Sequence, residues 1–473
     1  MSQDNALKKN VAGLWAGVFQ SLAYVAPAAT AASFFVVEAG VAGGAVPLTF
    51  ILATLGVASA MYMNYEFSKR ISHAGGYYSY VSAGFGGRLG AFSGWLYYIN
   101  VLGALTGFSV LFFAGVLWPL VPGLSAMAYG WIPLAFIPIV LIFSLLYFGL
   151  KPSLYYTMIG AVIEIVFVLA VSLLIIFSPN THNTISPFTT MGASFGNLGL
   201  ATVYAILGFV GLGSVITISE ELHNPKKIVP KAIITALVIG AVVYIFSSYA
   251  FVVGWGVNDM SGFASATNPG FTVVGNYLGP IAMAIFIVIT LNSFISNGIA
   301  EGNAFSRVGY ALSRDRVLFP KSMSEVHPET GSPRKMILFE AVLVTVISIA
   351  GGVIFGPFTG AAVITTLNGA CLYIVHLFAN FALPVYGKKT LKYSAKKWLP
   401  FLLGPLPATA VYAFAIYGVF FPLPAYPTNL ASYSLILMVV VGAIIALYVG
   451  MRRSSADVRK IGLQGTEMLT EEA

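Results

Sequence analysis

The stretch LGFVGLGSVITISEELHNPKKIVPKAI runs from Leu207 to Ile233. Its first half is apolar enough for a membrane, yet it contains Gly208, Gly211 and Gly213. Glycine weakens a helix because it has the most backbone freedom to lose. The second half turns abruptly to two glutamates, an Asn-Pro pair and two lysines. This pattern predicts a membrane helix that is broken in its middle and ends at a charged membrane surface.

The composition of the whole chain supports a membrane protein. Of its 473 residues, 58% are apolar and only 8% are charged, and the mean hydropathy is +0.87. Soluble domains carry roughly 25% charged residues, so most of this surface must face lipid. The net charge of +8 does not indicate nucleic-acid binding, because the basic residues form short clusters between apolar runs. The single cysteine, Cys371, excludes a disulfide framework and gives no sign of a redox or zinc site.

Twelve membrane spans are expected, because a bilayer core of about 30 Å needs roughly 20 apolar residues per helix. They lie near residues 11–37, 46–65, 89–118, 131–148, 154–177, 198–219, 228–255, 279–306, 336–355, 361–386, 398–420 and 433–451. The first apolar run is too long for a signal peptide, so we interpret it as an uncleaved helix. The tail, 452–473, is polar and is expected to be disordered in the cytoplasm. Residues 1–10 are also expected to be cytoplasmic.

The distribution of basic residues tests this count. If the N-terminus is placed inside, all 24 lysines and arginines fall on inside segments. The long outside segments, 178–197 and 256–278, contain none. The positive-inside rule therefore predicts that both termini of this multi-pass protein face the cytoplasm.

The first span is disrupted as well. Its sequence, GLWAGVFQSLAYVAPAATAASFFVV, has Pro27 at the centre, which removes one backbone donor and clashes with the preceding turn. Two disrupted spans five helices apart indicate a transporter built from inverted repeats, with its substrate site at the midplane. The alternatives are glycines that serve close helix packing and an ordinary proline kink.

Three motifs resemble the amino acid–polyamine–organocation transporters. They are NYEFSKRISHAGGYYSYVSAGFGGRLGAFSGWLYY at 64–98, GFVGLGSVITISEELHNPKKIVPKAI at 208–233 and NAFSRVGYALSRDRVLFPKSMSEVHPETGSPR at 303–334. The resemblance implies an all-α, five-plus-five inverted-repeat (LeuT-like) fold with two peripheral C-terminal helices. The repeats would cover 11–177 and 198–386, and the last two helices 398–451.

The resemblance also implies where an amino acid would bind. Its carboxylate would lie near Ala26–Thr30, and its ammonium would meet carbonyls near Leu207–Gly211. Phe209 would be either a lid over the substrate or a packing residue. The candidate substrate residues are Tyr24, Ala26, Pro27, Ala28, Ala29, Thr30, Leu207, Gly208, Phe209, Gly211 and Gly213.

The chain departs from the family at two positions. Many members have Gly-Phe-Glu or Gly-Phe-Asp where this chain has Gly211-Leu212-Gly213, and loss of that carboxylate favours a neutral zwitterionic substrate. Some relatives place a lysine where this chain has Glu164, near mid-bilayer. Burial favours the protonated form of an acid, so Glu164 is a candidate carrier of a coupling proton or, alternatively, a packing residue. The rival hypothesis is a sodium site near Asn292, Ser293, Ser296 and Asn297.

The remaining polar residues allow two interpretations each. Glu66, Glu220, Glu221 and Glu301 could pair with Lys69, Arg70, Arg307 and Arg314 as a cytoplasmic gate, or form a solvated rim. In the tenth span, His376 could relay protons, although a packing role is more common, as for Asn380, Asn368 and Thr366. Glu38 and Asp259 are expected to be exposed on the outside.

The sequence thus predicts a secondary amino-acid transporter of the cell membrane that works by alternating access with a proton as coupling ion. Alternatives are an exchanger, a sodium-coupled carrier, a polyamine or organic-cation transporter, and a sensor that binds without transport. No phosphate-binding loop and no intramembrane catalytic motif occurs, which argues against an ATP-driven pump and against an enzyme. No cofactor, metal or nucleic acid is expected, and the protein could be a monomer or a homodimer.

Overall fold

The computed structural model describes residues 6–266 and 268–464. Within these ranges the chain is helical and contains no β-strand. Nine helical stretches are long and apolar enough to cross a membrane, and Trp131–Tyr147 and Phe195–Leu207 are shorter apolar helices. Because the first long stretch, Leu14–Ser68, holds two predicted crossings, the described helices match all twelve predicted spans.

The helices of the first half of the chain run as follows. They are α1 (Leu14–Val25), α2 (Pro27–Ala29), η2 (Thr30–Phe34), α3 (Phe35–Ala42), η3 (Gly43–Ala45), α4 (Val46–Ser68), α5 (Tyr77–Phe85), α6 (Gly87–Gly103), η4 (Ala104–Phe112), α7 (Phe113–Leu117), η5 (Trp118–Leu120), α8 (Trp131–Tyr147), α9 (Leu150–Ile176) and η6 (Ser186–Phe188).

The second half continues in the same way. Its helices are α10 (Phe195–Leu207), η7 (Ser214–Glu221), α11 (Pro225–Trp255), α12 (Met260–Ser265), α13 (Pro269–Arg314, kinked at Gly279), η8 (Lys321–Ser324), α14 (Arg334–Phe355), α15 (Pro357–Lys389), α16 (Ala395–Leu403), α17 (Leu406–Phe420), α18 (Asn429–Arg452) and α19 (Ser455–Lys460).

Both predicted breaks are present. The first span stops at Ala26, whose φ of 49° and ψ of 67° are left-handed, and resumes at Pro27. Proline suits this position because the first residues of a helix need no backbone donor. The sixth span ends its α-helix at Leu207 and continues after Gly213 as the 3-10 helix η7. Between them Gly211 has a φ of 103°, which favours glycine.

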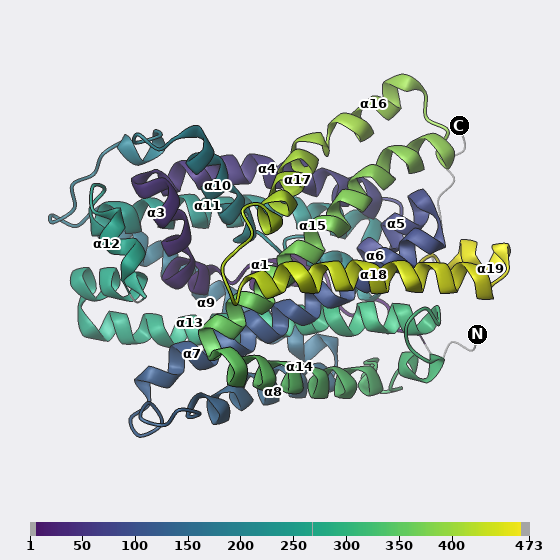
Figure 1. Cartoon of the computed structure of the whole chain (residues 1–473), viewed down its shortest axis with the longest axis horizontal. Helices are drawn as coiled ribbons and strands as arrows, with labels where there is room; N and C mark the ends of the chain where they lie inside the picture. Colours follow the sequence, from purple (N-terminus) through teal and green to yellow (C-terminus); the bar gives the residue numbers. More distant parts are fainter. Residues whose placement is uncertain (1–5, 267, 465–473) are drawn as a thin grey trace.

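The broken spans lie in the middle of the helix bundle (Figure 1). The spans that follow the two broken spans, α4 and α11, pack against each other. α17 and α18 lie at the periphery, where α18 contacts α6 and α15. This arrangement agrees with the predicted fold, including its two peripheral C-terminal helices.

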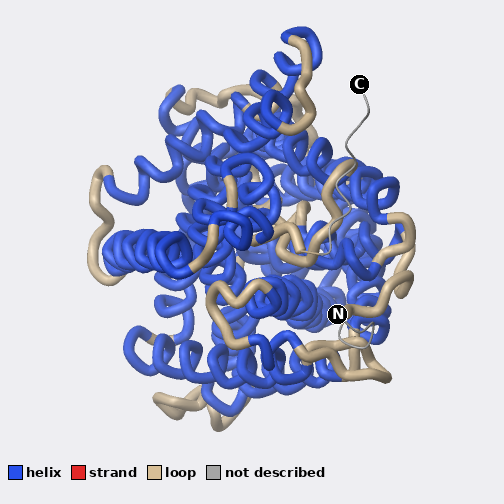
Figure 2. The backbone as a smooth tube through the Cα atoms, turned by 90° about the vertical axis from the view of Figure 1, so that its right-hand side faces the viewer, coloured by secondary structure: helices blue, strands red, loops and turns tan. Residues whose placement is uncertain are grey.

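Several loops that carry basic residues contact one another at one end of the bundle, which we call the charged face; this end faces the viewer in Figure 2. The charged face comprises residues 6–12, 66–76, 220–227, 307–335, 388–397 and 451–464. Here the N-terminal segment pairs with the end of the sixth span: Val11 N–H donates to Glu221 O at 2.7 Å, and His223 N–H donates to Ala12 O at 2.9 Å. These bonds tie together the ends of both broken spans.

The expected disorder of the tail from residue 452 is wrong up to residue 464. Arg453 donates to Asp315 O at 2.8 Å, and Gly462 N–H donates to the Asp315 carboxylate at 2.6 Å. Between them α19 forms and Ile461 is fully buried. The tail is ordered because it buries an apolar side chain and donates a hydrogen bond to a buried acid, which composition alone does not show. Residues 465–473 of the predicted tail lie outside the described residues.

Candidate functional site

A cavity of about 160 Å³ lies between the two breaks. Tyr24 and Thr30 line it from the two sides of the first break, and Gly208 lines it from the sixth span. Polar side chains of α13 and α15 complete the wall: Asn297, Glu301, Thr365, Thr366 and Asn368. Since a cavity of about 150 Å³ holds benzene, this one has room for a small amino acid.

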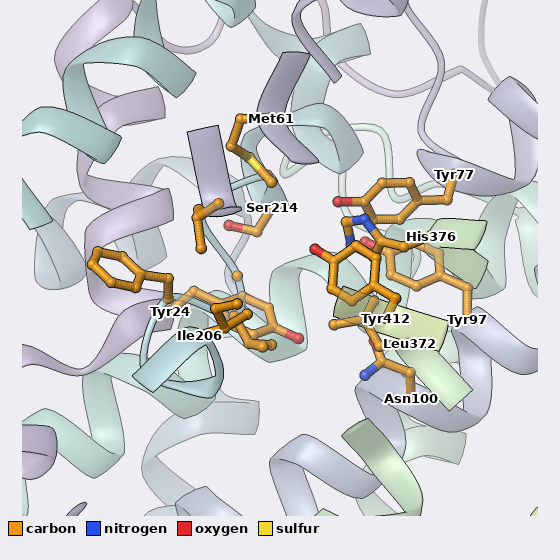
Figure 3. Close-up of a pocket in the computed structure, with 15 residues that line it drawn as sticks. Tyr24, Met61, Tyr77, Tyr97, Asn100, Ile206, Ser214, Leu372, His376 and Tyr412 are labelled. Carbon is orange, nitrogen blue, oxygen red and sulfur yellow. The ribbon is translucent and has the colours of Figure 1, made fainter. Parts of the chain in front are cut away.

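A second cavity, of about 30 Å³, lies on the side of the charged face, beyond Tyr24. Tyr77, His376 and Tyr412 converge on it from three different helices, and Ser214 faces them from the start of η7 (Figure 3). The His376 ring is 4.6 Å from that of Tyr77 and 4.8 Å from that of Tyr412. The volume of this second cavity suits about one water molecule.

Neighbouring helices hold the first break open through its backbone groups. The Ala29 N–H donates to Ser293 Oγ at 3.3 Å. The Val25 carbonyl accepts from the Tyr244 hydroxyl at 2.8 Å, and the Tyr24 carbonyl accepts from the Asn297 amide. Because buried backbone groups need partners, these contacts from α11 and α13 stabilise the interruption.

The sixth break depends on the absence of side chains. A Cβ at Gly211 would lie 2.0 Å from the Tyr24 ring, and one at Gly213 would lie 2.8 Å from the Tyr77 hydroxyl oxygen. The two breaks are therefore in van der Waals contact. Phe209 is buried against Tyr244, with ring centroids 5.1 Å apart, so in this conformation it packs beside the site.

Glu164 lies at the centre of a buried polar cluster. Its carboxylate accepts from Ser293 Oγ at 2.6 Å and from Asn292 Nδ2 at 3.2 Å. Asn292 also donates to Ser296 Oγ at 3.3 Å and accepts from the Tyr156 hydroxyl at 2.8 Å. Glu164 of the proton hypothesis and Asn292, Ser293 and Ser296 of the sodium hypothesis thus form one cluster, whereas Asn297 bonds the Tyr24 carbonyl and lines the larger cavity. Through Ser293 and Ala29, this cluster contacts the first break.

Two ion pairs connect the end of the sixth span to α13 at the charged face. Glu221 accepts from Arg307 at 2.9 and 3.1 Å, and both side chains are buried. Glu220 accepts from Arg314 at 2.9 and 3.0 Å and from the Ala74 N–H at 2.9 Å. Charge-assisted, bidentate arginine–carboxylate bonds are among the strongest hydrogen bonds in proteins.

His73 completes the second of these pairs. Its Nε2 lies 2.6 Å from Arg314, and its Nδ1 lies 3.0 Å from the Gly75 amide nitrogen. Burial, aided by the Arg314 charge, lowers the pKa of His73 to about 3. The imidazole is therefore neutral and can accept a hydrogen bond from the arginine.

The fold, the two breaks and the cavity between them are those of a transporter, and comparison with known proteins identifies the family. The sequence model described as amino acid permease matches residues 17–460. The chain belongs to this family. Its members are membrane transporters and not enzymes, so this permease is a transporter.

Several characterised permeases are similar to this chain. The serine/threonine exchanger SteT of Bacillus subtilis is 25% identical over 68% of the chain and 71% of its own length. The branched-chain amino acid permease BcaP of the same organism is 27% identical over 62% of the chain and 64% of its own length. The low-affinity putrescine importer PlaP of Escherichia coli is 22% identical over 74% of the chain and 79% of its own length. The three names cover different substrates.

The structure of the permease gathers most of the predicted site residues. Tyr24, Thr30, Leu207, Gly208, Phe209, Gly211 and Gly213 line one or both cavities. Ala26, Pro27, Ala28 and Ala29 form the break itself and line neither cavity. Of the predicted gate residues, Glu220, Glu221 and Arg307 bridge two spans. Glu66 instead pairs within its own helix, with Lys69 and Arg70.

Two acids lie elsewhere than expected. Glu38 is buried on α3, although the sequence predicts exposure, because α10 and α12 cover that turn of the first span. Glu301 was grouped with the gate, yet it lines the larger cavity and accepts from Ser109 Oγ at 2.9 Å. The spacing of Asn297 and Glu301, four residues apart on one helix, was the available signal for a shared face.

Other buried polar residues are missed by sequence reasoning. Gln20 donates to Ala300 O at 2.8 Å and accepts from Asn303 at 3.2 Å, between the cavity and the Glu221–Arg307 pair. Asn100 bonds Asn368, and His73 bonds Arg314. Polar residues within spans are functional candidates by default, so their mere presence was the signal.

Proposed function

We propose that this permease is a secondary active transporter of small, neutral amino acids that works by alternating access. One observation carries the proposal: the cavity of about 160 Å³ touches both broken spans and lies well inside the bundle. The first break borders this cavity through Tyr24, Val25 and Thr30, and the C-terminus of α10 borders it through Leu207. Helix N-termini favour a carboxylate and helix C-termini favour a cation, so the pair suits a zwitterion.

We further propose that the site is closed toward the charged face. In our proposal this face is cytoplasmic, with both described ends of the chain on it, as the basic residues predict. Ion pairs and the bridge between Ala12 and Leu222 close the path from the cavity to this face. Opening toward the cytoplasm would then break these bonds.

We further propose that the Glu164 cluster couples transport to an ion. The Ser293 hydroxyl donates to Glu164 and accepts from the Ala29 amide. A change in the charge of Glu164 would therefore alter the hydrogen bonding of the first break. A proton is our preferred coupling ion. The carboxylate, hydroxyl and amide oxygens of the same cluster are also sodium ligands, which makes sodium the rival.

The test is uptake of labelled amino acids by purified protein in liposomes, with and without an inward proton gradient. Gradient-stimulated uptake of a small neutral amino acid supports the proposal. Uptake that needs preloaded amino acid indicates exchange, and uptake that needs sodium indicates the rival ion. Uptake of putrescine alone would contradict an amino-acid site.

A variant pair then tests the coupling residue. Glu164→Gln should abolish stimulation by the proton gradient while exchange persists. Glu38→Gln is the matched control, since Glu38 is also a buried acid but lines neither cavity. Equal stimulation of wild type and Glu164→Gln would exclude the proton role.

A further inference from the structure

The larger cavity contains one acidic side chain that neither the proposed zwitterion site nor the coupling cluster uses. Glu301 lies on α13, one helical turn from Asn297 toward the charged face. Only 2% of its surface is exposed. No described lysine or arginine forms an ion pair with it, in contrast to Glu220 and Glu221.

The hydrogen bonds around Glu301 leave acceptor capacity unused. Ser109 Oγ lies 2.9 Å from Glu301 Oε2 and 2.6 Å from Asn297 Oδ1. A serine hydroxyl has a single hydrogen, so these two acceptors share it, and Asn297 is the other side chain that bonds the Glu301 carboxyl group. The Asn297 amide nitrogen is directed to the Tyr24 carbonyl, which fixes its oxygen toward Ser109. A carboxyl group offers about four acceptor positions, and the cavity is the space from which further donors can come.

The rest of the cavity wall favours a small polar group over a cation. The wall contains the polar Asn297, Thr365 and Asn368 and the aromatic rings of Tyr24, Phe34 and Phe108, and no described acidic residue besides Glu301 lines the cavity. A charge buried within the membrane is usually paired with opposite charge, and a cation here would find a single carboxylate. One hydrogen-bonded acid suits a hydroxyl or amide donor.

We propose that Glu301 determines specificity by accepting a hydrogen bond from the substrate's side chain. The permease would select small amino acids with a hydroxyl or amide group over apolar ones of the same shape. The proposal rests on the amino-acid site between the breaks. An apolar side chain in this cavity would displace water from Glu301 without replacing its hydrogen bond, and such losses reduce affinity.

Threonine and valine form the matched substrate pair, because they have the same shape and differ in a hydroxyl against a methyl group. Uptake of labelled serine and labelled leucine is measured in proteoliposomes, with unlabelled threonine or valine as competitor. We expect threonine to inhibit at about tenfold lower concentration than valine, because sites built to bond a hydroxyl reject analogues that lack it. In Glu301→Leu this ratio should fall to about one or invert.

Two further variants separate hydrogen bonding from charge and from damage to the fold. Glu301→Gln keeps an acceptor oxygen and should retain a preference for threonine. Glu38→Leu, at a buried acid that lines neither cavity, should leave the ratio unchanged. Because the readout is a ratio, lower expression or stability of a variant does not alter it.

The outcomes distinguish this inference from the proposed function. Amino-acid uptake without discrimination between threonine and valine, or with the same ratio in Glu301→Leu, overturns the role of Glu301 alone. Competition by diaminopropionate that exceeds competition by threonine and disappears in Glu301→Gln shows recognition of charge, and also overturns it. Folded protein that transports no amino acid instead overturns the proposed function.

Discussion

Different kinds of contact lie on the two sides of the cavity. Toward the charged face, the buried ion pairs Glu221–Arg307 and Glu220–Arg314 and a backbone bridge connect the spans. On the opposite side the contacts are aromatic: Phe34 and Phe108 of the cavity wall have ring centroids 5.1 Å apart. All five ion pairs found within the described chain lie at the charged face.

This difference has a consequence for alternating access. A buried ion pair leaves two desolvated charges when it breaks. An aromatic pair loses its preferred packing geometry but leaves no charge behind. Separating the contacts on the charged side should therefore cost more free energy than separating those on the opposite side.

The largest expected effect comes from breaking the buried pair on one side only. Arg307→Met leaves Glu221 buried without its partner, which should cost about 3–5 kcal/mol of stability. Thermal unfolding in detergent measures this loss. The double variant Glu221→Leu/Arg307→Met should recover most of it, because no unpaired charge remains. If the double variant is as unstable as Arg307→Met, the pair does not act as a unit.

The second effect concerns the contact between the two breaks. Gly211→Ala combines a left-handed backbone with a Cβ 2.0 Å from the Tyr24 ring, and should reduce uptake more than tenfold. Gly279→Ala is the control, because Gly279 also has a positive φ but open space around it. That variant should cost about 1–3 kcal/mol of stability through backbone strain, without reducing uptake tenfold. Equal effects of the two variants would mean that the Tyr24 contact is unimportant.

The third effect is a pH dependence at the charged face. The pKa of His73 is about 3 in the folded protein, against about 6.5 when unfolded. The unfolded chain therefore binds a proton first, and stability should fall as the pH drops below 6.5, by about 2 kcal/mol at pH 5. His73→Gln should flatten this part of the stability profile, measured as melting temperature. His182→Gln, at an exposed position, should leave the stability profile unchanged. If both variants flatten the profile equally, groups other than His73 cause its pH dependence.

The smallest effect is expected at the C-terminal segment. Ile461→Ser removes a fully buried apolar side chain next to the Asp315 contact, and should cost about 1–3 kcal/mol. Ile461→Val should cost less than half of that. A melting temperature that is unchanged in Ile461→Ser would show that the segment is not docked in the purified protein.

Local signals made most of the fold predictable. Hydropathy and the basic loops indicate the spans, and Pro27 and the glycines around Gly211 indicate the two breaks, although prolines such as Pro138 and Pro384 lie inside continuous helices. Which face of a helix points into the bundle depends on its neighbours and not on its own sequence. For that reason the sequence analysis groups Glu301 with the gate residues, although its side chain lines the cavity.

Long-range packing accounts for the other differences. Glu38 is buried because α10 and α12, far away in sequence, cover it. Glu164 and Asn292 belonged to rival hypotheses because nothing in the sequence shows that α9 and α13 bring them to 3.2 Å. The disorder predicted for residues 452–464 fails for the same reason, since the partners of this segment lie more than a hundred residues away.

The docked C-terminal segment also constrains the order in which the protein can be completed during synthesis. Asp315 receives its bond from Gly462, which leaves the ribosome 147 residues later. The Tyr78 hydroxyl, made long before, already donates to the same carboxylate oxygen, but the second donor becomes available only after almost the entire last third of the chain has been made. The charged face of this permease is finished last, by residues that cross no membrane at all.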